Sequence, residues 1–423
     1  MGSTEGNMLM IAHDRLLERL QVFAGSFDKR AALEICADDE LSGQTVDALL
    51  EQLCESGALR QVSDRYQLIE ARPSARLDEP DLLPWRKAHA YWYLGFIEGL
   101  QDPSFASQEA TLAQIDAEHA NIVRALDFSF AYRFDADLSL RLCIAAFRYW
   151  FIRGHFSEGI EYTLRSLSRV PGRQDDLKFK ALSRAGSLLE ATGDLERALV
   201  ATRQARDSAR DLGDMAAAAG ASVNMATVLR DVGQLPEAII TLREAVDTLR
   251  ALGANRKLIP SLCNLAAMQI ESGELDDVPA LLDECHNVAA ELSDEWAFSY
   301  VHFNYGDCHR AAGALREAGG RYRQALLECN KLGDMRVREM VLRRLAELAA
   351  ETQKYETAAK LFGAAEIARD QCHCAIPPVE TNQAIVAISD VRAALGENAF
   401  ERAWHDGREM ECSETDRLAL LLN

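Results

Sequence analysis

Polar residues stand at five positions that are forty residues apart, and their types are suited to binding a ligand. We call such a set of equivalent positions a register. This register consists of Arg184, Asn224, Asn264, Asn304 and Arg344. The asparagine amide offers both a donor and an acceptor to a main chain, and arginine pairs with carboxylates or phosphates. Two further registers, three and six residues along, add charged candidates: Arg230, Asp307, Arg310 and Glu347. We expect these residues to form a polar binding surface of mixed charge.

The same period governs small and apolar residues, which indicates the elements that position this surface. Turn glycines recur at Gly193, Gly233, Gly273 and Gly313, with Gln353 in the next place. Small residues recur seven positions before each turn and five and twelve positions after it. Small side chains let helices approach closely, and glycine adopts turn angles that other residues resist. Each period therefore predicts one antiparallel pair of helices.

This pattern resembles the tetratricopeptide repeat, in a long forty-residue form, over about residues 177–370. Residues 137–170 look like a divergent sixth copy, in which Phe147 occupies a position that should be small. We predict an all-α fold, a tetratricopeptide-repeat superhelix whose first helices line a concave surface. The asparagine register then resembles the ladder that grips extended peptides in kinesin light chain and in peptide-sensing bacterial regulators. Alternatively, these asparagines bond across to the neighbouring repeat.

The first 70 residues do not follow the repeat. Helical patterns cover Asp14–Phe23, Lys29–Cys36 and Thr45–Ser56, and Leu59–Val62 with Tyr66–Ile69 has the pattern of a hairpin. Three helices and a hairpin suggest a small winged helix. Residues 1–80 carry 8 basic and 15 acidic side chains, a net charge of −7. This charge favours an interdomain arm over direct DNA binding, which stays the alternative.

Segments along most of the chain are similar to one family of regulators. They are Phe23–Phe27, Leu49–Leu59, Asp116–Ile122, Arg148–His155, Leu361–Glu366, Pro377-Pro378 and Leu395–Arg408. These segments resemble the sensor half of STAND-type regulatory ATPases and of LuxR- and AfsR-like bacterial transcriptional regulators. The resemblance implies a signal-sensing, protein-binding module. Since the chain has neither a G-x-x-x-x-G-K-[ST] motif nor a recognisable DNA-reading helix-turn-helix after the repeats, we expect that half alone, as a fragment or a stand-alone protein.

Aromatic residues are concentrated between positions 85 and 156. They include Trp85, Trp92, Phe96, Tyr149, Trp150 and Phe151. One interpretation is a bulky junction where the arm meets the first repeats, and the other is an apolar ligand pocket. The expected organisation is a winged-helix arm over 1–78, an aromatic junction over 79–170, five repeats over 171–370 and capping helices over 371–423.

Composition limits the possible functions. The 423 residues include 46 basic and 66 acidic side chains, a formal charge of −20, which opposes nonspecific binding to nucleic acid or anionic membranes. Cys372-His373-Cys374 has no second pair at ligand spacing, so we expect no metal. The chain also lacks a G-x-S-x-G motif, and its nine His are scattered, so we expect no catalysis and no cofactor. We expect a cytoplasmic protein whose partner is a protein or peptide, or a small-molecule inducer. A ligand-independent scaffold is the alternative.

Overall fold

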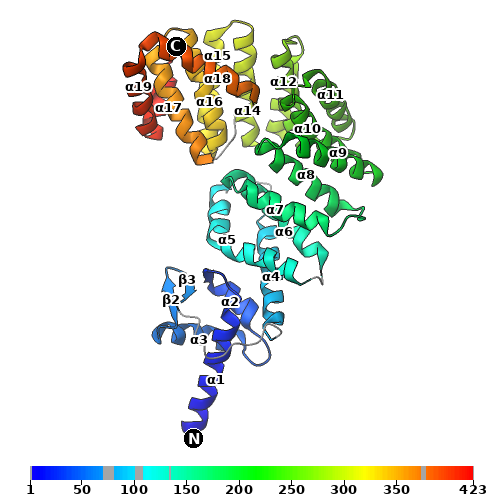
Figure 1. Cartoon of the computed structure of the whole chain (residues 1–423), viewed down its shortest axis with the longest axis vertical. Coiled ribbons are helices and arrows are strands. Elements are labelled where there is room, and N and C mark those ends of the chain that lie inside the picture. The colour runs from blue at the N-terminus through cyan, green and yellow to red at the C-terminus, as the bar shows by residue number, and fades with distance from the viewer. Residues whose placement is uncertain (1, 70–80, 101–107, 133–134, 373–377, 423) are drawn as a thin grey trace. The chain divides into compact units, whose positions relative to one another are not determined.

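The computed structural model describes residues 2–69, 81–100, 108–132, 135–372 and 378–422 (Figure 1). The chain divides into two compact units. The first comprises residues 1–103, 109–149 and 165–171, and the second comprises 104–108, 150–164 and 172–423. Each unit is described here by itself.

The first unit combines helices with a small sheet. Its elements are α1 (Gly2–Leu20), β1 (Ser26–Asp28), α2 (Lys29–Cys36), α3 (Gly43–Glu55), β2 (Leu59–Val62), β3 (Arg65–Leu68), α4 (Leu83–Gly99), α5 (Gln108–Ala131) and most of α6 (Ala136–Arg153). The antiparallel sheet has the order β1-β3-β2. The predicted helix Lys29–Cys36 and the hairpin are confirmed, and β1 is an addition. The name winged helix stays a prediction.

The second unit repeats a pair of helices five times, which confirms the predicted all-α array. The pairs are α8 (Asp176–Ala191) with α9 (Leu195–Asp211), α10 (Met215–Asp231) with α11 (Leu235–Ala251), α12 (Asn255–Ser272) with α13 (Val278–Glu291), α14 (Glu295–Ala311) with α15 (Leu315–Leu332), and α16 (Met335–Glu351) with α17 (Tyr355–Cys372). Before them comes α7 (Phe156–Ser168), and after them come α18 (Pro378–Leu395), α19 (Glu397–Glu409) and α20 (Cys412–Leu420).

Local chemistry explains why each pair forms where it does. Gly193 adopts a positive φ of 79° at its turn, and Gln353 takes the same left-handed conformation at 61° in the last repeat. Asp214 ends the turn that follows α9, and its carboxylate accepts a hydrogen bond from the Ala217 N–H at 2.8 Å. A Cβ on Gly186 would lie 2.5 Å from Thr202 Cγ2, so steric contact requires glycine at this member of the small-residue register.

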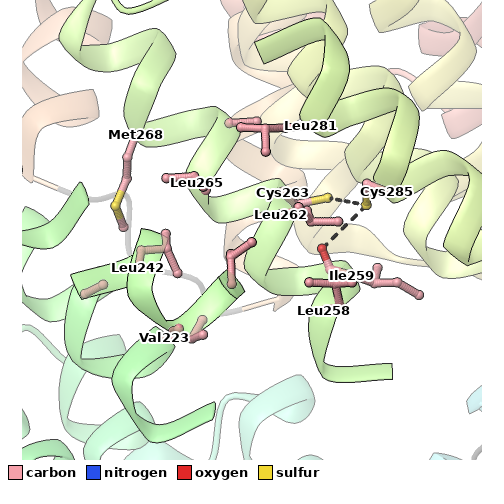
Figure 2. Packing of buried hydrophobic residues seen from close by; sticks show 14 of the residues in the cluster. Val223, Leu242, Leu258, Ile259, Leu262, Cys263, Leu265, Met268, Leu281 and Cys285 are labelled. Atoms are coloured by element: carbon pink, nitrogen blue, oxygen red, sulfur yellow. Dashed lines mark hydrogen bonds between the residues drawn. The ribbon is translucent and has the colours of Figure 1, made fainter. Parts of the chain in front are cut away.

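The core of the array lies between the two layers of helices. Figure 2 shows Leu242 of α11 and Leu262, Cys263 and Met268 of α12 in one buried cluster that extends to Cys285 of α13. Neighbouring first helices also pack directly on one another, whereas neighbouring second helices in the described residues have few mutual contacts. The array is thus more tightly packed along its first helices, as the concave side of a superhelix should be.

In the divergent copy before α8, the large residue Phe147 stands at the position where the other repeats have a small residue. Trp150 is 1% exposed and lies against the second helix of its pair, α7. A Cβ on Gly159 would come within 2.9 Å of both Trp150 and Leu188. Gly159 therefore leaves the space that the Trp150 and Leu188 side chains occupy.

Candidate ligand-binding site

The amide register lies on the first helices of three successive repeats. Asn224 Nδ2 donates to Ser183 Oγ at 3.1 Å, and Asn304 Nδ2 donates to the Cys263 carbonyl at 3.2 Å. Both bonds join neighbouring first helices, so the cross-repeat alternative holds for these two residues. Asn304 is only 4% exposed. Half-buried Asn264 has no side-chain hydrogen bond within the described chain.

The Ser183 bond orients Asn224 without using its acceptor. Within the residues that the structure describes, no protein donor binds Asn224 Oδ1. The amide is therefore held by its nitrogen and can still accept a hydrogen bond from a ligand N–H. Asn264 keeps both functions of its amide, whereas Asn304 is largely used in holding α14 to α12.

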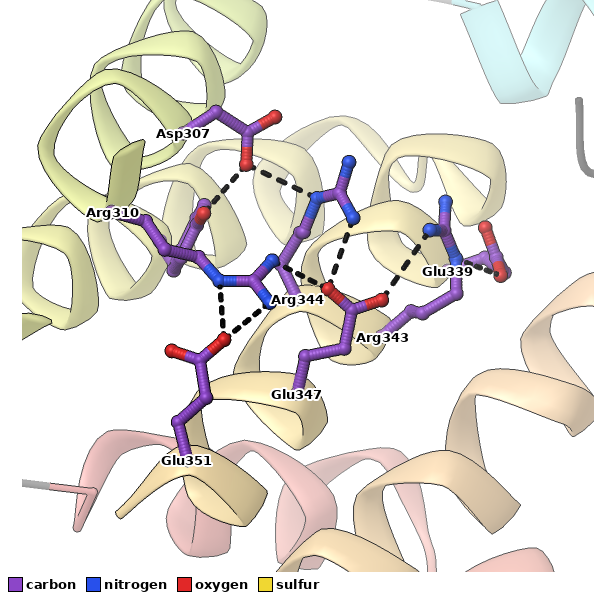
Figure 3. A network of polar contacts seen from close by, with 8 residues as sticks. Asp307, Arg310, Glu339, Arg343, Arg344, Glu347 and Glu351 are labelled. Carbon is purple, nitrogen blue, oxygen red and sulfur yellow. Dashed lines mark hydrogen bonds and ion pairs between the residues drawn. The ribbon is translucent and has the colours of Figure 1, made fainter. Parts of the chain in front are cut away.

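The charged candidates of the last two repeats meet in one network (Figure 3). Arg344 lies 3.1 Å from Asp307 and 3.0 Å from Glu347, and Arg310 donates to Glu347 at 2.6 Å. The network also contains three residues that the sequence did not nominate: Glu339, Arg343 and Glu351. Its three arginines and four carboxylates neutralise one another almost completely.

Glu347 is the centre of this network. Its side chain is 3% exposed. Burial raises the pKa of Glu347, but the charges of Arg344, Arg310 and Arg343 outweigh burial and hold it below the usual value. Burial and the charge of Asp307 raise the pKa of Tyr322, whose hydroxyl donates to Asp307 at 2.6 Å. These groups are committed to contacts within the protein, which leaves little of their charge for a ligand.

The earlier repeats differ. Arg230 pairs with its neighbour Asp231 at 2.8 Å. Close by, burial and then the charge of Asp231 raise the pKa of Glu190 to about 7, although Arg336, Arg230 and a hydrogen bond with Thr227 oppose the shift. Burial also lowers the pKa of Arg184. In these repeats, Arg184 therefore lies near the middle of its first helix, and Glu190 and Arg230 lie near the C-terminal ends of theirs.

The aromatic candidates are divided between the two units. In the first unit, the Trp85 ring lies 3.9 Å from the Arg19 guanidinium, Trp92 stacks on Phe96 with ring centroids 5.6 Å apart, and Tyr149 is buried. In the second, Trp150 donates to Glu158 at 2.6 Å, and the Phe151 ring packs edge-on against Phe156. The apolar pocket stays a prediction.

Sequence reasoning missed a second polar centre, within the first unit. Glu118 of α5 is 2% exposed and accepts hydrogen bonds from Arg65 at 2.6 Å, Tyr93 at 2.8 Å and Asn121 at 2.9 Å. Asn121 also accepts from the Ala24 N–H at 2.7 Å. This centre ties the small sheet to α4 and α5. The stretch Asp116–Ile122 contains both its Glu and its Asn, but was used only as a family signature.

The described part of the chain holds neither a metal-ligand cluster nor a membrane-spanning helix. No three His, Cys, Asp or Glu side chains there are placed to hold a metal ion. His373 and Cys374 lie outside the described residues. None of the helices described has the length and apolar character needed to cross a membrane.

Comparisons with known proteins give loose structural likenesses. No family model matches the chain, and no curated protein matches it. A Rap protein solved with competence and sporulation factor is 12% identical, with 78% of this chain and 96% of that one covered and a TM-score of 0.47. A STAND protein with a tetratricopeptide-repeat sensor from Pyrococcus horikoshii is 12% identical, with 97% and 65% covered and a TM-score of 0.46. The apo quorum sensor NprR from B. thuringiensis is 14% identical, with 78% and 99% covered and a TM-score of 0.44. Because these scores are low, the fold assignment rests on the chain's own repeated helix pairs.

Proposed function

We propose that this chain is a non-catalytic, signal-sensing module of a bacterial transcriptional regulator, and that it binds a peptide along the first helices of its repeats. The observation that carries the proposal is the state of the amide register. Asn224 and Asn264 recur at equivalent positions on adjacent helices, and each retains an unused amide function. An extended peptide presents N–H and C=O groups that such amides can bind in succession.

The proposal also gives a role to the bonds that tie neighbouring first helices together. A ladder needs rigid supports, and the hydrogen bonds of Asn224 and Asn304 hold their first helices to the preceding ones. The buried ion network adds a further tie between α14 and α16. Binding then takes place on a surface whose geometry is fixed before the ligand arrives, which lowers the entropic cost of binding.

The test is a selection of peptides from a randomised heptapeptide library, followed by anisotropy measurements on the peptides recovered. Asn224→Ala combined with Asn264→Ala removes two amides, each contributing about 1 kcal/mol, so affinity should fall roughly thirtyfold. Ser183→Ala is the matched control, because it breaks the Asn224–Ser183 bond but leaves both amides in place. If the double variant binds as tightly as the wild type, or if Ser183→Ala weakens binding equally, peptide binding by these amides is wrong.

A further inference from the structure

Two thiols of the third repeat are in contact inside the core (Figure 2). The Cys263 sulfur of α12 lies 3.4 Å from the Cys285 sulfur of α13, and the Cys285 thiol donates to the Ile259 carbonyl at 3.5 Å. Both residues are free cysteines. A disulfide needs its two sulfurs about 2.0 Å apart, so each sulfur would have to move by less than about 1 Å. Small changes in side-chain torsion suffice for such a movement.

Neither of these two positions is a cysteine in the other four repeats. The residues equivalent to Cys285 are Ala205, Ala245, Ala325 and Ala365, and those equivalent to Cys263 are Ser183, Val223, Phe303 and Arg343. The need for a small side chain explains the residue at position 285, but it does not explain the thiol that faces it. The two departures from the repeat occur together in one pair of helices, where their sulfurs meet.

The backbone of this pair also differs from that of the other repeats. Pro260 lies inside α12, where it has no N–H to donate to the helix. The second helix α13 begins at Val278, whereas the second helices of the other repeats begin at the position equivalent to Leu275. The third pair therefore has fewer main-chain hydrogen bonds than its neighbours. A covalent link between α12 and α13 would restrict the local opening of this pair.

We propose that Cys263 and Cys285 form an oxidative modification site, at which a hydroperoxide converts the two thiols into a disulfide that links α12 to α13. Cys263 reacts first, because it is 5% exposed and Cys285 is fully buried. Its sulfur attacks the peroxide O–O bond, which gives a sulfenic acid and releases an alcohol or water. The Cys285 sulfur then attacks the sulfenic sulfur, the S–S bond forms, and the hydroxyl group leaves as water. Two thiols are oxidised and one O–O bond is reduced, so the electrons balance.

The surrounding core determines how fast the disulfide forms and how long it lasts. The hydrogen bond with Cys285, and then burial, raise the pKa of Cys263, so oxidation proceeds through a small thiolate fraction and is slow. The same burial limits the access of thiol reductants, so the disulfide persists once it has formed. The site therefore responds to sustained exposure to peroxide. This inference does not depend on peptide binding.

The test exposes the reduced, folded full chain to hydrogen peroxide, followed by alkylation in denaturant and peptide mass mapping. We expect peptides joined through Cys263 and Cys285, while buried Cys36 stays reduced. Exchange of the α12 and α13 amides should slow at least about tenfold on oxidation. Cys285→Ala is the matched control, because alanine is the residue of the other four repeats. In this variant, Cys263 should give a sulfenic acid that dimedone traps, and amide exchange should not slow.

Two results would overturn this inference. If Cys263 and Cys285 stay reduced in the folded protein while exposed Cys412 is oxidised, or if they pair only after unfolding in urea, the two thiols serve packing alone. If the disulfide forms but amide exchange in α12 and α13 is unchanged, or slows equally in peroxide-treated Cys285→Ala, the disulfide does not restrict the opening of this pair.

Discussion

Substitution of Glu347 tests whether the charges of the last repeats act as structure or as a binding surface. Glu347→Gln keeps the shape of the side chain and removes its charge. The carboxylate accepts from Arg310 at 2.6 Å and from Arg344 at 3.0 Å, with Arg343 at 3.8 Å. Hydrogen bonds to charged groups contribute about 1.5–3 kcal/mol each, and neutral ones about 1 kcal/mol. The amide that replaces the carboxylate still accepts from charged guanidinium groups, so the cost is the lost attraction between opposite charges, about 1–4 kcal/mol for the two pairs.

The remaining partners of the arginines narrow this estimate. Arg310 keeps Glu351, Arg344 keeps Asp307 and Arg343 keeps Glu339, so no guanidinium is left without a carboxylate. Breaking a buried pair outright costs about 3–5 kcal/mol, which is an upper limit here. We expect a loss of about 3 kcal/mol. Glu351→Gln is the control, because its side chain is 37% exposed and its ion pair with Arg310 should contribute under about 1 kcal/mol.

The assay combines urea unfolding with hydrogen exchange, because repeat arrays can unfold in stages. Exchange of the α14 and α16 amides should increase in Glu347→Gln and change little in Glu351→Gln. The pH dependence has a definite sign. Because the pKa of Glu347 is lowered in the fold, its stabilisation is complete above its unfolded pKa and is lost as pH falls through the folded value. If Glu347→Gln and Glu351→Gln lower stability by the same small amount, the network is not structural, and its residues become candidates for ligand contacts again.

Three further substitutions test other parts of the structure. The pKa of Glu190 is raised to about 7, so the free energy of unfolding of the wild type should decline as pH rises from about 5 to 7. In urea titrations, Glu190→Gln should flatten this pH dependence and add up to about 3 kcal/mol of stability at pH 8. Gly306→Ala places a Cβ 2.4 Å from the Tyr322 ring and should lower the free energy of unfolding by about 1–3 kcal/mol. Gly95→Ala is the control: no atom lies within 4 Å of its Cβ, so thermal unfolding should show a neutral or slightly stabilising effect. Glu118→Gln should cost about 2–4 kcal/mol and speed hydrogen exchange in α4 and α5; unchanged exchange there would contradict its role as a tie.

The fold could be predicted from the sequence because each repeated position has one steric function. Gly186 and Gly306 stand in a register of small residues, where a Cβ would strike Thr202 and Tyr322, and Gly193 begins the register of turn residues with positive φ. Such requirements restrict residue type strongly, so they remain visible as a period. The hairpin of the first unit was also predictable, but β1 was not, since three residues carry too little pattern to separate a strand from a loop.

The candidate site was less predictable. The partner of a long charged side chain depends on how far that side chain extends, and not only on its position in the repeat. Arg310 bonds Glu347 and Glu351, 37 and 41 positions away, and both fall close to the forty-residue period. The registers therefore brought the correct residues together but did not show that they would neutralise one another. Nor did they show that Asn224 would bond to Ser183 through its nitrogen alone.

One departure from the repeat lies on α12, between two buried alanines of the same register. A lysine stands at position 257, where the adjacent repeats have Ala217 and Ala297. Its stem lies over Gly220 of α10, and the charges of Asp214 and Asp176 attract it while those of Lys180 and Arg184 repel it. In the last two repeats, by contrast, every arginine around Glu347 has a carboxylate partner. The open amide functions of Asn224 and Asn264 lie on α10 and α12, so ligand binding should depend mainly on these helices, with the later repeats acting chiefly as their support.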